Sequence, residues 1–113
     1  FYIFLKNKYI IYKPLPDCLT IKNSKIEGLG VFAIKNIPEG QSLGISHVYN
    51  IEFKDGWIRT PLGGFINHSD DPNAVKMKDL ITNYYHLIAL RDINTDEEVT
   101  VKYTLYDVHA SSK

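Results

Sequence analysis

Three short segments of the chain combine residue types that could bind a ligand or hold a reacting group. The central segment, Phe65–Asn73, reads FINHSDDPN and places Asn67 beside His68. Amide, imidazole and hydroxyl groups offer hydrogen-bond donors and acceptors at fixed offsets, and the sequence Asp71-Pro72-Asn73 favours a turn that folds them together. Such a polar run indicates a binding site rather than packing alone.

The other two segments lie on either side of this run. Upstream, Glu27–Ala33 reads EGLGVFA, with Gly28 and Gly30 separated by one residue. Downstream, Asp96–Tyr103 reads DEEVTVKY. A lone Gly-x-Gly is typical of any turn before a strand, so the upstream segment is informative only together with the others.

In this order, the three segments resemble the SET-domain protein lysine methyltransferases. The resemblance covers residues 19–106 as a minimal, free-standing SET domain, after an N-terminal hairpin and linker (1–18) and before a tail (107–113). It implies a mostly β fold of several small curved sheets with little helix. It also implies a C-terminal pseudoknot, an exception to the rule that chains do not thread through loops.

The resemblance further implies an activity, the transfer of a methyl group from S-adenosyl-L-methionine to a lysine side-chain amine of a protein or peptide. A non-catalytic module of the same fold that binds cofactor or peptide is the alternative. The cofactor-binding residues carried over by the motifs are Glu27, Gly28, Leu29, Gly30, Asn67, His68 and Tyr106. For Tyr106 a place in the wall of the lysine channel is an equal alternative.

Tyr103 matches the family tyrosine whose hydroxyl lies beside the transferred methyl group and the incoming nitrogen. With eight tyrosines in the chain, a core position is the default for each, and Tyr103 stands apart by following Asp96-Glu97-Glu98. Apolar residues at Val99 and Val101 alternate with polar neighbours, which predicts that Tyr103 points inward from a strand. Glu97 and Glu98 face opposite sides of a strand, so we expect them to begin it rather than form a carboxylate pair.

The substrate side departs from the family pattern. Tyr84 and Tyr85 are candidates for the lysine channel, together with Val101, which stands where some members carry the Phe or Tyr that governs the number of methyl groups. The segment 45–64 is shorter than the usual insert that forms one wall of the peptide groove. Either a second copy of the chain completes the groove as a homodimer, with the apolar hairpin at Phe1–Tyr12 as the candidate interface, or this is a minimal domain with an unusual target.

Bulk properties narrow the remaining choices. The formal net charge is zero and the pI is near 7.1, which gives no basic field for direct binding of nucleic acid. Residues 1–12 are too short and too interrupted by lysines for a membrane span or a signal peptide. Cys18 is the only cysteine, so the sequence predicts no internal disulfide, no metal site and an intracellular protein.

The abundance of β-branched and aromatic residues predicts short strands. We expect them at 1–5, 9–12, 19–22, 31–34, 42–45, 74–77, 83–90 and 99–105. Between residues 44 and 65 the sequence shows no clean period, so no element is predicted there.

Overall fold

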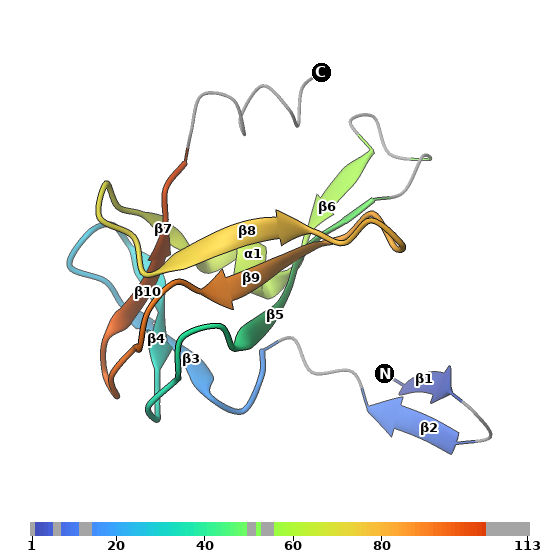
Figure 1. The fold of residues 1–113 in the computed structure, drawn as a ribbon, viewed down its shortest axis with the longest axis horizontal. Coiled ribbons are helices and arrows are strands. Elements are labelled where there is room, and N and C mark those ends of the chain that lie inside the picture. The colour runs from blue at the N-terminus through green and yellow to red at the C-terminus, as the bar shows by residue number, and fades with distance from the viewer. Residues whose placement is uncertain (1, 6–7, 12–14, 50–51, 53–55, 104–113) are drawn as a thin grey trace.

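The computed structural model describes residues 2–5, 8–11, 15–49, 52 and 56–103. Strands dominate, as predicted, and they form three separate sheets (Figure 1). The first sheet is a two-stranded hairpin of β1 (Tyr2–Leu5) and β2 (Lys8–Ile11), in which Leu5 pairs with Lys8. Figure 1 shows this hairpin apart from the two larger sheets.

The second sheet has four strands in the order β3-β4-β10-β7. Its strands are β3 (Leu19–Asn23), β4 (Leu29–Ala33), β7 (Asn67–His68) and β10 (Glu98–Val101). β10 pairs with β4 in antiparallel fashion and with β7 in parallel fashion, with Thr100 opposite Asn67. β10 therefore lies between β4, the Gly-x-Gly strand, and β7, the Asn-His strand. β7 and β10 belong to the two segments that the expected pseudoknot would thread past one another.

The third sheet has the order β6-β5-β9-β8 and is antiparallel throughout. Its strands are β5 (Ser42–Tyr49), β6 (Trp57–Arg59), β8 (Ala74–Lys78) and β9 (Tyr85–Ala89). Register shifts between Ser42 and Gly44 and between Ile45 and His47 bend β5.

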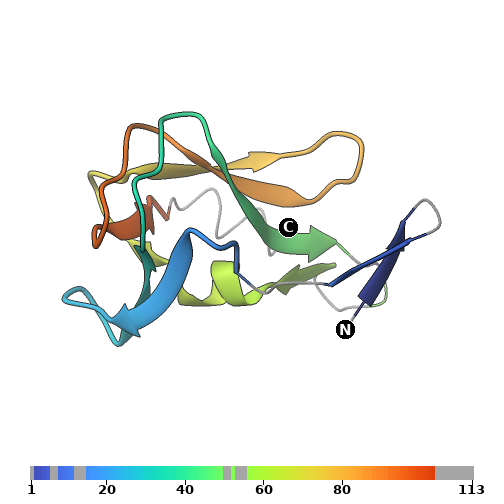
Figure 2. The same cartoon turned by 90° about the horizontal axis from the view of Figure 1, so that it is seen from below.

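One short helix, α1 (Pro61–Phe65), contacts β4 of the second sheet and both β5 and β6 of the third. Figures 1 and 2 show it covered by the third sheet. The Thr60 hydroxyl caps α1 by accepting from the Gly63 amide at 3.3 Å, and it donates to the Ile45 carbonyl at 2.6 Å. Pro61 suits the first helical position because its missing N–H would have no partner there. The cap therefore fixes the helix to β5.

Gly63 allows α1 to approach β5 closely. A Cβ at this position would overlap the Ser46 carbonyl oxygen and come within 3.3 Å of the His47 ring. Gly64, by contrast, has no atom within 4 Å of the place its Cβ would take. Packing therefore requires a glycine at position 63 but not at position 64.

The buried core joins side chains from the second and third sheets and from α1. Its residues are Cys18, Leu19, Val31, Ala33, Ile37, Leu43, Leu62, Ile66, Ala74, Leu87, Ala89, Ile93, Val99 and Val101. Among them sits one buried amide, Asn73, whose Nδ2 donates to the Glu98 carbonyl and whose Oδ1 accepts from the Thr100 amide, both at 2.8 Å. Asn73 therefore ties the turn of the central motif to β10.

The predicted strands are confirmed apart from their bounds, with one correction that concerns the site. β10 ends at Val101, two residues short of Tyr103, and Thr100 is buried along with its neighbours Val99 and Val101. The prediction that Tyr103 points inward from a strand is therefore wrong. The alternation of side-chain faces ends with β10 at Val101, which is also the last residue paired with β7. β6 and α1 lie in the segment 44–65, where no element was predicted, and β7 is a further short strand absent from the prediction. In the described part of the chain, no helix has the length and apolar character needed to cross a membrane.

Substitution of the two helical glycines separates their roles. We expect Gly63→Ala to lower the free energy of unfolding by about 1–3 kcal/mol, because backbone atoms of β5 must move to admit the methyl group. Gly64→Ala has open space and should be neutral or stabilising by about 0.5–1 kcal/mol. Urea denaturation of both variants measures the difference, and equal stabilities would contradict the close approach of α1 to β5.

Candidate functional site

The site begins with the turn between β3 and β4. The Ser24 amide donates to the Gly28 carbonyl at 2.8 Å, and the Ser24 hydroxyl accepts from the Ile26 amide at 2.8 Å. Gly28 has a φ of 47°, in the left-handed region that favours glycine. These contacts close the turn and leave Gly28 with open space around its Cα.

Asn67 holds this turn against β10. Its Nδ2 lies 3.1 Å from the Glu27 carbonyl oxygen, 3.3 Å from that of Leu29 and 2.9 Å from the Glu98 carboxylate. An amide nitrogen has two hydrogens, so three acceptors surround two donors. Nothing among the described residues donates to the Asn67 Oδ1, which leaves this oxygen as an available acceptor. The predicted cofactor residues Glu27, Leu29 and Asn67 therefore meet in one place.

Glu98 completes this cluster and was missed in the sequence, where it was interpreted only as the start of a strand. Its carboxylate accepts from the Ser24 hydroxyl at 2.9 Å as well as from Asn67. A Cβ on Gly30 would overlap this carboxylate, which explains a glycine at that position. Glu97 points the other way and accepts from the Asn73 amide at 3.0 Å, as the opposite facing of neighbours in a strand requires.

His68 links the central motif to the residue that follows β10. The backbone amide of Tyr103 donates to its Nδ1 at 2.7 Å, so the proton of the neutral ring lies on Nε2. Nε2 is 3.0 Å from the Asp70 carboxylate and donates to it. The aromatic rings of His68 and Tyr103 also lie 5.3 Å apart. His68 thus positions Tyr103 by a hydrogen bond and a ring contact.

The Tyr103 hydroxyl donates to the Ile66 carbonyl oxygen, directly after α1. The residue remains 49% exposed, so one side of its ring faces outward. Partial burial raises the pKa of the Tyr103 phenol, the Glu27 carboxylate raises it further, and the Arg59 guanidinium acts in the opposite direction. The Tyr103 hydroxyl therefore stays protonated at neutral pH.

The three channel candidates lie in different environments. Tyr85 contacts Trp57, with ring centroids 5.0 Å apart, and the Lys76 ammonium lies 4.8 Å from its ring centroid. Val101 is buried in the core, with 8% of its surface exposed. Tyr84 lies at the end of the β8–β9 turn, where its carbonyl accepts from the Asp79 amide at 2.8 Å. The cofactor candidate Tyr106 lies outside the described residues.

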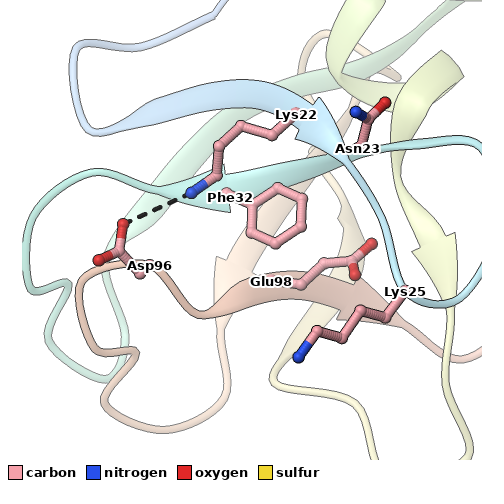
Figure 3. Close-up of a pocket in the computed structure, with 6 residues that line it drawn as sticks. All are labelled: Lys22, Asn23, Lys25, Phe32, Asp96 and Glu98. Carbon is pink, nitrogen blue, oxygen red and sulfur yellow. Dashed lines mark hydrogen bonds and ion pairs between the residues drawn. The ribbon is translucent and has the colours of Figure 1, made fainter.

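A surface hollow of about 520 Å³ lies beside the cluster and shares Glu98 with it (Figure 3). Phe32 forms its floor, with the Lys22 ammonium 4.7 Å from the ring centroid and 3.5 Å from the Asp96 carboxylate. The remaining lining residues are Asn23 and Lys25. Figure 3 shows Lys22 and Asp96 turned toward one another at one end of the hollow. Across the described residues, no group of three or more His, Cys, Asp or Glu side chains is arranged to hold a metal ion.

Comparison with known proteins decides the family. The SET-domain family model matches residues 46–104, which is half of the chain and includes Asn67, His68 and Tyr103. The chain belongs to the SET-domain family of protein lysine methyltransferases. This SET domain is 30% identical over 106 residues to a Schizosaccharomyces pombe histone-lysine N-methyltransferase named as specific for H3 lysine 37, covering 75% of this chain and 72% of the relative. It is also 38% identical over 52 residues to a Plasmodium falciparum variant-silencing SET domain-containing protein, of which it covers 2%.

Solved structures support the fold. A candidate histone methyltransferase of Plasmodium falciparum superposes with a TM-score of 0.64 at 23% identity, over 80% of this SET domain and 96% of that chain. The methyltransferase domain of human PR domain-containing protein 2 superposes with a TM-score of 0.61 at 18% identity, over 80% of this chain and 79% of the other. The mostly β fold of small sheets with little helix is thereby confirmed.

The contact between Gly30 and Glu98 can be tested by a double-mutant cycle. We expect Gly30→Ala to destabilise the protein by about 1–3 kcal/mol, because displacing the Glu98 carboxylate leaves the Asn67 and Ser24 donors unpaired. In a Glu98→Ala background the same change should cost much less, since the overlap is gone. Strictly additive effects in denaturant unfolding would show that the two residues do not interact.

Proposed function

We propose that this SET domain is an S-adenosyl-L-methionine-dependent protein-lysine N-methyltransferase with Tyr103 at its reaction centre. The observation that carries the proposal is the pairing of β7 with β10. It brings Asn67 to the Gly-x-Gly turn and His68 to Tyr103 within one small sheet. Family membership alone would not identify a reaction centre, so the proposal rests on this set of contacts.

The residues around the turn fit the methionine part of the proposed cofactor. An ammonium group needs acceptors, and the Asn67 Oδ1 offers one beside the Glu98 carboxylate. The bare backbone at Gly28 leaves room for a ligand to approach the main chain. Asn67, His68 and the backbone of residues 27–30 would hold the cofactor, which would supply an electrophilic methyl group.

The chain's own contribution is to present a neutral amine in line with that methyl group. A lysine of pKa about 10.4 is neutral at pH 7 about once in 2,500 molecules, a cost of about 4.6 kcal/mol. Partial burial beside Tyr103 would lower the pKa of an incoming amine by desolvation, and the proton would leave to solvent. Because the Tyr103 hydroxyl hydrogen points to Ile66, the lone pairs of its oxygen are free to accept from the amine and orient it.

The acceptor is a lysine-containing protein, and histones belong in the first panel because the fission yeast relative is named for a histone lysine. An intracellular site of action follows from such an acceptor. The specific lysine of that relative is not carried over, because the substrate side of this SET domain is built from its own short 45–64 segment.

Mass spectrometry of histones and a cell lysate incubated with the protein and methyl-labelled S-adenosyl-L-methionine tests the proposal. We expect labelled lysine, and we expect Tyr103→Phe to reduce the rate by roughly 10²-fold, because the amine loses its orienting oxygen. Cofactor at 100 times its Kd should raise the free energy of unfolding by about 2.7 kcal/mol in both proteins. Asn67→Ala should abolish that stabilisation. Stabilisation by cofactor without any label would favour the non-catalytic binding module instead.

The pH dependence of the rate distinguishes the titrating group. Because the Tyr103 pKa lies above its usual value of 10, the phenol stays protonated below pH 10 and loses its proton only above it. The rate should therefore rise between pH 7 and 9 as the acceptor amine loses its proton. Tyr103→Phe should keep the shape of this profile, and a variant profile that becomes flat would assign the titration to Tyr103 instead.

A further inference from the structure

A row of side chains crosses the third sheet on the face that packs against α1. The register pairs Arg59 with His47, His47 with Tyr85, and Tyr85 with Lys78, so one residue from each of the four strands lies in line. Residues directly opposite one another on neighbouring strands point to the same side of a sheet. The cations Arg59 and Lys78 therefore lie at the two ends of the row, and the rings of His47 and Tyr85 lie between them.

Packing identifies which side this is. Leu87 and Ala89, two and four residues after Tyr85, are buried in the core, and the His47 ring lies near Gly63 of α1. Side chains two apart in a strand share a face. The row therefore lies on the same face of the sheet as the core and extends away from α1. Ile66, whose carbonyl accepts from the Tyr103 hydroxyl, directly follows α1.

Aromatic rings extend the row into a wall. Trp57 contacts both Tyr85 and Tyr49, with ring centroids 5.0 Å and 5.3 Å apart, and Tyr49 is 42% exposed. Lys76, on the same face, places its ammonium over the Tyr85 ring. The Lys76 side chain thus already covers the Tyr85 ring, so this face presents cations beside its rings.

The cations of this face have no ion-pair partners in the described part of the chain. Arg59 and Lys78 are exposed, and neither has a described carboxylate within salt-bridge distance. Of the carboxylates that the structure describes, Glu52 and Asp79 are the nearest to them in sequence, and both are engaged already. Asp79 accepts from the backbone of its own turn and pairs with His86, which points to the other face. Among the described residues, this face therefore presents Arg59 and Lys78 without carboxylate partners, although the whole chain has no net charge.

We propose that this wall, formed by Arg59, Lys76 and Lys78 with the rings of His47, Tyr85 and Trp57, docks acidic residues that flank the acceptor lysine in the protein substrate. The inference rests on the proposed function and adds the substrate class. Charge complementarity selects the occupant, because carboxylates would pair with cations that lack partners, whereas a basic peptide would be repelled. The wall lies close to Tyr103, because α1 contacts β5 and β6 and the Tyr103 hydroxyl donates to the Ile66 carbonyl directly after α1.

The spacing of the row suggests a specific peptide. Arg59 and Lys78 are separated by three strand spacings of about 4.8 Å, which puts their Cα atoms about 14 Å apart. An extended peptide covers this distance in about four residues. Glutamates at the second residue on either side of the acceptor lysine therefore match the two cations.

Kinetics with synthetic peptides test the inference. The acceptor lysine is flanked at those two positions by glutamate, by glutamine or by lysine, in otherwise identical peptides. We expect kcat/KM to be about threefold to tenfold higher for the glutamate peptide than for the glutamine peptide, mainly through KM, and the preference to fade in 0.5 M salt. The lysine peptide should be the poorest substrate.

Charge reversal provides the matched variants. Lys78→Glu should remove most of the preference for the glutamate peptide and improve the lysine peptide, while Lys35→Glu, an equal change between β4 and β5, should alter neither. Arg59→Glu is less clean because Arg59 also acts on Tyr103. Thermal melting confirms that each variant is folded.

The outcomes separate the two proposals. Equal use of the three peptides, or a preference for the lysine peptide, would overturn the acidic-substrate inference and leave the methyltransferase intact. Absence of label in every peptide and protein would overturn both. Stronger inhibition by a single-stranded oligonucleotide than by polyglutamate would assign the wall to a nucleic acid and likewise overturn the inference.

Discussion

The position of β10 between β4 and β7 is the constraint on which the rest of the structure depends. Each edge of this strand brings one part of the site into place, the Gly-x-Gly turn on one side and the Asn-His pair on the other. The buried side-chain amide of Asn73 also holds this strand, because it bonds to the Glu98 carbonyl and to the Thr100 backbone amide. Loss of β10 would therefore separate every residue of the candidate site.

Several polar side chains of this site each bond to more than one partner. The Glu98 carboxylate accepts hydrogen bonds from both Ser24 and Asn67. The Asn67 side chain also donates to the carbonyl groups of Glu27 and Leu29 in the turn between β3 and β4. His68 uses one ring nitrogen for the Tyr103 backbone and the other for Asp70. Such networks hold their members in a single arrangement when every partner is present. The site is consequently shaped before any ligand arrives, which is the condition for aligning two reactants at low entropic cost.

Sequence alone predicted the strand-rich fold and the residues that meet around the turn, because those depend on local residue types and on motifs. It did not predict α1 or β6, since Thr60, Pro61 and Gly63 act through a cap and a close approach that leave no periodic signal. Glu98 was misinterpreted because its partners, Ser24 and Asn67, are distant in sequence. Tyr103 was expected on a strand face, but its orientation comes from single bonds to His68 and Ile66. Long-range contacts of this kind cannot be derived from spacing.

The Ser24–Glu98 contact spans 74 residues, and the pairing of β4 with β10 joins residues almost as far apart in sequence. Contacts of such long sequence separation carry a large loop-closure cost and tend to form late in folding. The third sheet contains the local β8–β9 and β5–β6 pairings, which can form without such long-range contacts. During synthesis the turn between β3 and β4 would then emerge early and lack its partner Glu98 until the β10 residues leave the ribosome. Catalytic competence would arise in one of the last steps of folding, so an incomplete chain could not transfer methyl groups prematurely.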